Sequence, residues 1–351
     1  MIQRICLVLI ILAVATMGCQ DVVPVSPGLL GERGTVMLEE GVEPEGVPEL
    51  EDAPESDPEP MPALVEVVFP DPNLDKAIRE AIGKSEGAIY TTDLLSLDRL
   101  EAHDMGIVDL TGLEFCVNLG FIWLSNNNIV DLTPLSQLPG CTVQLTDRWG
   151  DNFQWCYLTV WLSGNRIVDL SPLAALTSPD ELQLWLSRNQ ISDLTPLAGL
   201  SNLSGLYLSR NQIVDISPLT GLSKLYLLEL WGNQIEDISP LAGLVNLSWL
   251  ELEGNKIVDI SSVSSMSKLS NANFSSNQIK DISPLCNVKS LEYLQLRDNH
   301  ISDVAPLATH TQLTLLDLRY NDISDIAALC DFTDSTEVKL DGNPVSSGGV
   351  S

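Results

Sequence analysis

Apolar and polar positions alternate in the same way many times along the chain. Residues 203–222 read LSGLYLSRNQIVDISPLTGL, and the later copies place their asparagine 22 positions after the last one. Within this copy Leu206 and Leu208 flank Tyr207, which is the period-two pattern of a strand with one buried face. A fixed period of this length predicts a solenoid, in which each rung buries its leucines only when neighbouring rungs stack on it.

An asparagine stands at the turn after each predicted strand. Its amide both donates and accepts hydrogen bonds, so it can satisfy backbone groups that turn inward where the strand ends. Met105 takes this position in a degenerate first copy. The remaining copies are marked by Asn127, Asn165, Asn189, Asn211, Asn233, Asn255, Asn277, Asn299, Asn321 and Asn343. We therefore predict ten full rungs and a last partial one over residues 97–345.

The second half of each rung reads IxDISPLxxL or a close variant. In Ser217-Pro218 and Thr195-Pro196 a hydroxyl directly precedes a proline whose φ suits a first helical turn. We expect this hydroxyl to cap the turn. Only about eight residues remain before the next strand, so the return should be a short 3₁₀ or single α turn. The aspartate of the IxDI segment recurs in each rung, and we therefore interpret it as part of the turn.

The phrase LxxLxLxxNxI is the leucine-rich-repeat signature, and the DIS/TPL return with its 22-residue period resembles the internalin type of bacterial leucine-rich repeat. The resemblance covers residues 66 to 345. It implies an α/β fold, namely a right-handed solenoid with a concave parallel sheet and short 3₁₀ turns on the convex side. It also implies an N-terminal helical cap, surface display and protein recognition.

Residues 64–96 match such a cap. Asp71 and Pro72 supply an N-cap and a first-turn proline, and Gly83 ends the helix. A second short helix is expected from Thr92 to Leu97. The apolar face of the first helix consists of Leu74, Ala77, Ile78, Ala81 and Ile82.

Residues 1–18 have the features of a signal peptide. Arg4 precedes an apolar run, Ile5 to Ala15, which is short for a membrane-spanning helix. The following residues up to Cys19 resemble the lipobox of bacterial lipoproteins, although Thr16 stands where leucine is usual. The resemblance implies a lipid on Cys19 and a membrane anchor. Plain secretion and an uncleaved signal anchor are the alternatives.

Residues 19–63 are rich in acid and proline. Between Gln20 and Glu66 there are 13 acidic residues against Arg33 alone. Such a stretch buries too little apolar surface to fold, and like charges keep it extended. We interpret it as a tether that holds the repeats off a membrane; an ordinary disordered leader is the alternative.

An insertion over residues 139–156 separates two rungs. It carries Trp149 and Trp155 and is bracketed by Cys141 and Cys156, for which we predict a disulfide because exported chains favour them.

The other cysteines are expected to be unpaired. Cys116 replaces a core leucine. Cys286 and Cys330 occupy the same position two rungs apart, roughly 10 Å, which exceeds disulfide reach.

The chain carries 48 acidic against 18 basic residues, a net charge of −30. Nucleic acid is therefore not expected as a partner, because its binding needs clustered Lys and Arg. In the tail, 346–351, no sortase-type signal is present. No enzyme is predicted, since the best catalytic pairing, His103 with Ser125 on the next rung, has no motif around it. No cofactor or metal is expected.

One outward column of the predicted strands is aromatic in four consecutive rungs, and acidic residues follow it. The alternative is that these rings only pad the strands, but Trp and Tyr are enriched in binding hot spots. We expect the rings to be exposed and to form a ligand-binding surface. Its candidate residues are Trp123, Trp161, Trp185, Tyr207, Glu229, Trp231, Trp249, Glu251 and Glu253.

The sequence thus predicts an exported, lipid-anchored cell-envelope protein that binds a protein or peptide on its concave face. Two other functions stay open. A glycan or cell-wall ligand also suits a series of aromatic rings, and an intracellular regulatory scaffold can share the same repeat period.

Overall fold

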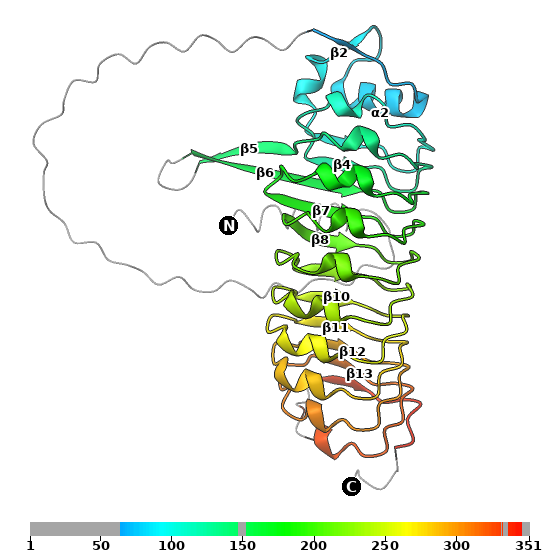
Figure 1. The fold of residues 1–351 in the computed structure, drawn as a ribbon, viewed down its shortest axis with the longest axis vertical. Coiled ribbons are helices and arrows are strands. Elements are labelled where there is room, and N and C mark those ends of the chain that lie inside the picture. Colours follow the sequence, from blue (N-terminus) through cyan, green and yellow to red (C-terminus); the bar gives the residue numbers. More distant parts are fainter. Residues whose placement is uncertain (1–63, 147–151, 331, 333–335, 346–351) are drawn as a thin grey trace, which may run out of the picture. The chain divides into compact units, whose positions relative to one another are not determined.

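The computed structural model describes residues 64–146, 152–330, 332 and 336–345 (Figure 1). For residues 141–146 and 152–155 only the backbone is described. Of the two compact units of the chain, Met1–Glu59 and Pro60–Ser351, only the second contains described residues. The predicted signal peptide, Cys19, the tether and the tail lie outside them.

The N-terminal cap forms as predicted. Helix α2 (Pro72–Ile82) begins at Asp71, whose Oδ1 accepts the N–H of Asn73 at 2.9 Å, and ends at Gly83 with φ 68°. The same carboxylate accepts the N–H of Val108 at 2.7 Å, so the cap is joined to the first rung. Burial raises the pKa of Asp71, but four backbone donors outweigh it and hold the pKa below its ordinary value.

The helix buries a narrower face than expected. Leu74, Ala77 and Ile78 are buried, whereas Ala81 is exposed. Strands β1 (Glu66–Val67) and β2 (Ile89–Tyr90) pair antiparallel beside the helix. The 3₁₀ helix η1 (Asp93–Ser96) is the predicted second short helix.

Eleven parallel strands of the described chain stack in sequence order into one sheet (Figure 1). This confirms the leucine-rich-repeat solenoid. The strands are β3 (Arg99–Glu101), β4 (Phe121–Trp123), β6 (Asn152–Trp161), β7 (Glu181–Trp185), β8 (Leu203–Tyr207), β9 (Leu227–Glu229), β10 (Trp249–Glu251), β11 (Asn271–Asn273), β12 (Tyr293–Gln295), β13 (Leu315–Asp317) and β14 (Glu337–Lys339).

The asparagines form a continuous ladder of hydrogen bonds inside the turns. Asn255 is representative: its Oδ1 accepts the N–H of Ile235 at 3.0 Å, and its Nδ2 donates to the carbonyls of Leu230 and Leu252 at 3.0 Å each. Ile235 and Leu230 belong to the preceding rung, and Leu252 to the same rung as Asn255. Each asparagine therefore joins two rungs, which confirms its predicted structural role.

Ten 3₁₀ helices of the described chain return the rungs to the sheet, as predicted. They are η2 (Leu113–Phe115), η3 (Thr133–Leu135), η4 (Ser171–Ala175), η5 (Thr195–Leu197), η6 (Ser217–Leu219), η7 (Ser239–Gly243), η8 (Ser261–Ser265), η9 (Ser283–Asn287), η10 (Ala305–Leu307) and η11 (Ala327–Leu329).

The group that caps these turns differs from the predicted one. Asp215 Oδ1 accepts the N–H of Ser217 at 2.8 Å, and the Ser217 hydroxyl donates to the other carboxylate oxygen at 3.0 Å. Ser217 already lies in the first helical turn, so its hydroxyl cannot cap it; the aspartate two residues earlier does so. At Asp237 and Asp281 the same hydrogen bonds lower the pKa of the carboxyl.

In each rung, the residue directly before the asparagine of the turn adopts a left-handed backbone conformation. Arg210, Gly232, Gly254 and Ser276 have φ of 56°, 68°, 66° and 53°. Only glycine enters this region without steric cost. The rung geometry therefore forces several larger side chains into a strained backbone conformation.

The insertion forms an antiparallel hairpin, in which β5 (Cys141–Thr146) pairs with an N-terminal extension of β6 (Figure 1). Cys141 lies opposite Tyr157, and Cys156 lies opposite Thr142. The two cysteines are one position out of register, which does not favour the predicted disulfide, because bridged cysteines need closely approaching Cβ atoms. The side chain of Cys141 lies outside the described part, so the disulfide stays a prediction.

The remaining described cysteines behave as expected. Cys116 is fully buried, and burial raises the pKa of its thiol to about 12. Cys286 and Cys330 are free and exposed.

Candidate functional site

Four aromatic residues occupy equivalent positions in four adjacent strands. Trp123 pairs with Trp161, Trp161 with Trp185, and Trp185 with Tyr207. Equivalent positions of neighbouring strands lie about 4.8 Å apart on one face of a sheet. These four residues, called the aromatic row below, lie outside the cluster of core leucines. They therefore point away from the core, as alternation along the strands predicts.

The rings stack on one another along the row. The centroids of Trp185 and Tyr207 are 3.5 Å apart with 14° between the ring planes, and those of Trp161 and Trp185 are 4.4 Å apart with 26°. Trp123 meets Trp161 edge to face, at 5.3 Å and 61°. Because parallel stacking covers the ring faces, the row presents mainly ring edges to a partner.

The rings are less exposed than the sequence led us to expect. Trp123, Trp161 and Tyr207 expose 7%, 9% and 9% of their surface. Each ring packs on a neighbour, and Trp123 is also stacked on His103 with the centroids 4.0 Å apart. Sequence position gives the direction of a side chain but does not reveal how rings on adjacent rungs cover one another.

Two indole N–H groups of the row have no acceptor among the described residues. They belong to Trp161 and Trp185, and both nitrogen atoms are buried. A buried donor without a partner costs about 1–3 kcal/mol. A ligand that supplied acceptors here would remove that cost, so these groups are candidate recognition elements. Nothing in the sequence could indicate them, because they depend on the side-chain rotamers.

Two glutamates, Glu229 and Glu251, continue the same register beyond Tyr207 and are called the acidic pair below. Burial and the neighbouring carboxylate of Glu251 raise the pKa of Glu229 to about 8. Burial raises the pKa of Glu251 to about 7. Ion pairs of the described residues form elsewhere on this face, for example between Arg99 and Glu101, and none reaches the acidic pair.

The other predicted site residues lie beside this row. The Arg210 guanidinium sits over the Trp231 ring, 4.5 Å from its centroid. Trp249 begins β10 and is partly exposed. Glu253 accepts a hydrogen bond from Asn273 Nδ2 at 3.0 Å. The structure thus brings four rings and two carboxylates into one line and places Trp231, Trp249 and Glu253 at its margin.

His103 was not among the residues predicted for this surface. Its ring extends the aromatic row by stacking on Trp123 with 26° between the planes, and its Nδ1 lies 2.8 Å from Asp104 Oδ2. Its place two positions before Met105, on an outward column, could have indicated this. Among the described residues no hydrogen bond joins His103 to Ser125, so the pairing considered for catalysis does not form.

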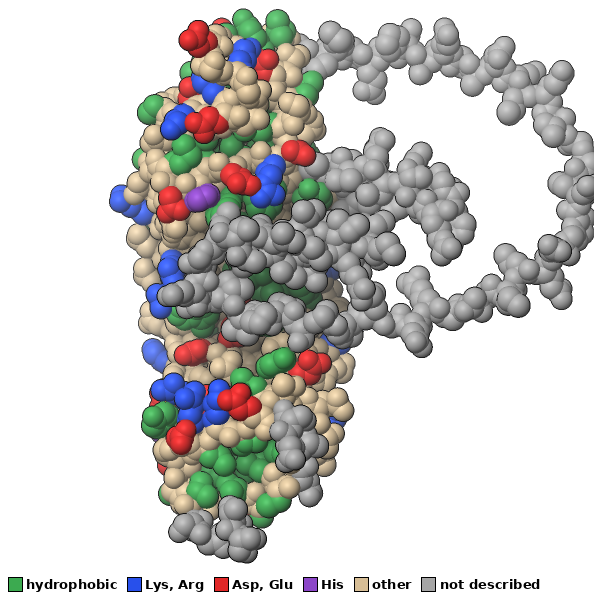
Figure 2. Space-filling model, turned by 180° about the vertical axis from the view of Figure 1, so that it is seen from behind, with side chains coloured by type: hydrophobic (Ala, Val, Ile, Leu, Met, Phe, Trp, Pro, Cys, Tyr) green, Lys and Arg blue, Asp and Glu red, His purple; other side chains and the backbone are tan. Residues whose placement is uncertain are grey.

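Basic and acidic side chains lie together over the C-terminal rungs, in the lower half of Figure 2. At the end of β13, Arg319 donates hydrogen bonds to the buried Asp317 through Nε at 2.9 Å and through a terminal nitrogen at 2.5 Å. Burial raises the pKa of Asp317, but these hydrogen bonds lower it below its ordinary value. Because the charges of Arg319 and Asp317 satisfy each other, we interpret this pair as structural.

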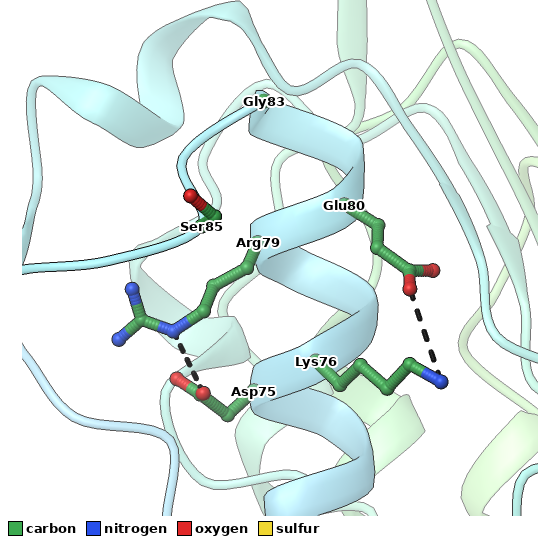
Figure 3. Close-up of a pocket in the computed structure, with 6 residues that line it drawn as sticks. All are labelled: Asp75, Lys76, Arg79, Glu80, Gly83 and Ser85. Atoms are coloured by element: carbon green, nitrogen blue, oxygen red, sulfur yellow. Dashed lines mark hydrogen bonds and ion pairs between the residues drawn. The ribbon is translucent and has the colours of Figure 1, made fainter.

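A shallow hollow on helix α2 does not form a second site (Figure 3). Its charged side chains pair with each other, Arg79 with Asp75 at 2.8 Å and Lys76 with Glu80 at 3.9 Å. Within the described residues no group of His, Cys, Asp and Glu is arranged to hold a metal ion. The same part of the chain has no helix with the length and hydropathy needed to cross a membrane.

Comparisons with known proteins identify the repeats. A family profile described as leucine-rich repeats (two copies) matches residues 201–243 and 267–309. No curated protein matches the chain. The fold is also similar to the plant peptide hormone receptor RGFR1, solved in complex with RGF2, at 22% identity and a TM-score of 0.53, over 66% of this chain and 37% of that one.

Two solved bacterial structures are more similar in sequence. An internalin (inlF) of Listeria monocytogenes is 32% identical with a TM-score of 0.65, over 78% of this chain and 83% of that one. Internalin C2 (inlC2) of the same organism is 39% identical with a TM-score of 0.56, over 65% of this chain and 94% of that one. At this level of identity over most of its length, the chain is a leucine-rich-repeat protein of the internalin family.

Proposed function

We propose that this protein is an exported, non-enzymatic binding protein that recognises a protein or peptide through the aromatic row and the acidic pair. The leucine-rich-repeat fold is typical of protein-binding domains. The observation that carries the proposal is the unsatisfied pair of indole donors, Trp161 and Trp185, in a line of stacked rings. Burying these donors without acceptors lowers the stability of the folded chain. A ligand that supplies the acceptors would recover this free energy on binding.

The ring geometry favours a peptide over a glycan. Aromatic residues bind sugars mainly through open ring faces, but here the faces of Trp161, Trp185 and Tyr207 cover one another at centroid separations of 4.4 and 3.5 Å. What remains at the surface is ring edges, and the buried N–H donors of Trp161 and Trp185 come within reach of a ligand once the side chains around them move. An extended peptide offers backbone carbonyls to such donors along its whole length.

The test compares variants of the row for peptide binding. Trp161→Ala and Trp185→Ala should each weaken binding by about 2 kcal/mol, close to thirtyfold, because each removes a central ring and an N–H donor. Tyr293→Ala is the matched control, since Tyr293 is an aromatic residue of the same sheet outside the row. Unchanged affinity in both tryptophan variants, for a peptide that the intact protein binds, would refute the proposed surface. Binding to peptidoglycan or polysaccharide instead would favour the glycan function.

The proposals of export and of a lipid anchor are based on the sequence of residues 1–63 alone. If Cys19 carries the lipid, Cys19→Ser should move the protein from the detergent phase to the aqueous phase in a partitioning assay, because the apolar run before it is short for a stable anchor. A Cys19→Ser protein that still entered the detergent phase would contradict lipid anchoring. Recovery of an unprocessed chain from the cytoplasm would favour the intracellular scaffold.

A further inference from the structure

The two ends of the sheet differ in how they are covered. At the first end helix α2 packs against β3, and Leu100 in this strand is fully buried. At the other end β14 pairs with β13, and no strand of the described chain lies on its outer side (Figure 1). The first and last rungs of a solenoid need a cover for their apolar residues. Among the described residues the last rung has no helix like the one that covers the first.

The apolar residues of the last rung are only partly buried. Leu316 and Leu318 are fully buried in the rung before it, whereas their equivalents, Val338 and Leu340, are partly exposed. Other partly buried apolar residues at this end of the core are Ile326, Ala328 and Phe332. Figure 2 shows hydrophobic side chains gathered over these C-terminal rungs. The described part of the chain therefore leaves apolar surface at this end for a partner to cover.

The backbone of β14 is arranged to accept another strand. The Glu337 N–H donates to a carbonyl of the preceding rung at 2.8 Å, and the Lys339 carbonyl accepts an N–H of that rung at 2.9 Å. Successive residues of a strand direct their backbone groups to opposite sides, so the N–H and carbonyl of Val338 point away from β13. An antiparallel neighbour exchanges two hydrogen bonds with such a residue. Val338 is thus the natural centre of an antiparallel pairing.

The charges beside Val338 select the orientation of that neighbour. Glu337 and Lys339 lie on one face of the strand, with Lys339 Nζ 3.3 Å from Glu337 Oε1, and their side chains expose 66% and 33% of their surface. When two copies of β14 pair antiparallel about Val338, Glu337 of each copy lies opposite Lys339 of the other. Opposite charges directly across a strand pair stabilise it. The strand is therefore complementary to a second copy of itself.

Other strands fit this edge less well. A lysine on an edge strand discourages pairing with another chain, because it brings an unmatched charge to the new neighbour. A uniformly acidic or basic segment would match only one of Glu337 and Lys339 and would repel the other. A second β14 matches both charges and also brings its own partly exposed Val338 and Leu340 to the apolar end of the core.

We propose that β14 is a dimerisation edge, to which a second copy of this chain adds its own β14 antiparallel with Val338 at the twofold axis. This inference goes beyond the proposed function. The axis is perpendicular to the sheet, so the sheets of the two copies become continuous and their outward columns lie on the same side. Both aromatic rows then face the same direction, and the dimer offers two binding surfaces to one partner or one surface.

Sedimentation equilibrium of the whole purified protein, over a series of concentrations, tests the proposal. The expected result is a reversible equilibrium between monomer and dimer. Lys339→Glu and Glu337→Lys should each weaken dimerisation by at least about tenfold, because like charges then face each other on both sides of the axis. The double variant, with both exchanges, should dimerise like the native protein, since it restores opposite charges across the axis.

A mixture of the two single variants gives the sharpest test. Each variant alone should be monomeric, but together they should form a heterodimer, because the glutamates of one strand face the lysines of the other. A misfolded variant could not form this heterodimer, so its appearance also shows that both variants fold. Lys256→Glu is the matched control: it makes the same change of charge at an exposed site, where Lys256 lies 3.8 Å from Glu236, and should leave dimerisation unchanged.

Several results would overturn the proposal. A native protein that stays monomeric at every concentration would show that a second copy does not cover this end. A dimer that persists in both Lys339→Glu and Glu337→Lys would place the interface elsewhere. An equal loss of dimer in Lys256→Glu would show only the effect of net charge. Failure of the mixed variants to pair, when circular dichroism shows both to be folded, would rule out the antiparallel register.

Discussion

The strongest quantitative prediction concerns Asn255. Replacing it by alanine removes the acceptor of the Ile235 N–H and the donors to the carbonyls of Leu230 and Leu252, all at 3.0 Å and buried. A hydrogen bond of this kind contributes about 1 kcal/mol net, and an orphaned buried group costs about 1–3 kcal/mol. Asn255→Ala should therefore lower the free energy of unfolding by about 3 kcal/mol.

The chain contains a matched comparison in Asn343. It makes the same contacts, to Ile323, Leu318 and Leu340 at 3.1, 2.8 and 2.9 Å, but in a partly buried setting. Water can replace partners that solvent reaches, so Asn343→Ala should cost only about 1 kcal/mol. The difference between the two variants isolates the effect of burial from the effect of losing an asparagine.

Urea unfolding followed by far-ultraviolet circular dichroism measures both variants. A lower midpoint with an unchanged slope reports lost stability, whereas a smaller slope or a second transition reports rungs that uncouple at the substitution. Asn255→Asp keeps the acceptor but loses the donors and buries a carboxylate, so it should cost at least as much as the alanine variant. Equal losses for Asn255→Ala and Asn343→Ala, or a loss below about 0.5 kcal/mol for Asn255→Ala, would refute the reasoning.

Two further predictions concern the same domain. Because the pKa of Glu229 is raised from 4.5 to about 8, protonation of its carboxyl favours the folded state at low pH, and this contribution is lost as the pH rises through 8. Glu229→Gln should therefore raise the thermal midpoint relative to the native protein at pH 8.5 but not at pH 4; a difference that does not depend on pH would contradict the raised pKa. Ser276, with φ 53°, is strained, so Ser276→Gly should stabilise the domain by about 0.5–1 kcal/mol and Ser276→Val should destabilise it; the opposite order in urea unfolding would show that the position is not strained.

The periodic features of this protein were predictable from sequence because each is repeated. The leucines of β8, the asparagine turn and the outward direction of Trp185 all follow from alternation and a fixed period. The cap helix was predictable for a local reason, since Asp71, Pro72 and Gly83 mark its ends.

Features that depend on rotamers or on pairing were not predictable in the same way. The capping group proved to be Asp215 rather than Ser217, because the start of the turn shifts by a residue relative to the expected one. The exposure of the aromatic row depends on how rings lean across rungs. In the insertion, the spacing of Cys141 and Cys156 does not fix the hairpin register, which sets the two cysteines one position apart.

The asparagine ladder gives the array a direction. Asn277 accepts the N–H of Ile257 in the rung before it, Asn299 does so for Ile279, and Asn321 for Ile301. The isoleucine N–H of each turn thus finds its acceptor in the asparagine of the following rung, and not in that of the preceding rung. A rung duplicated in the interior finds the same successor and is accommodated, whereas removing a rung from the C-terminal end leaves one backbone amide without its acceptor. Repeat number can therefore change within the array at little cost, but the C-terminal boundary needs a partner for its last amide.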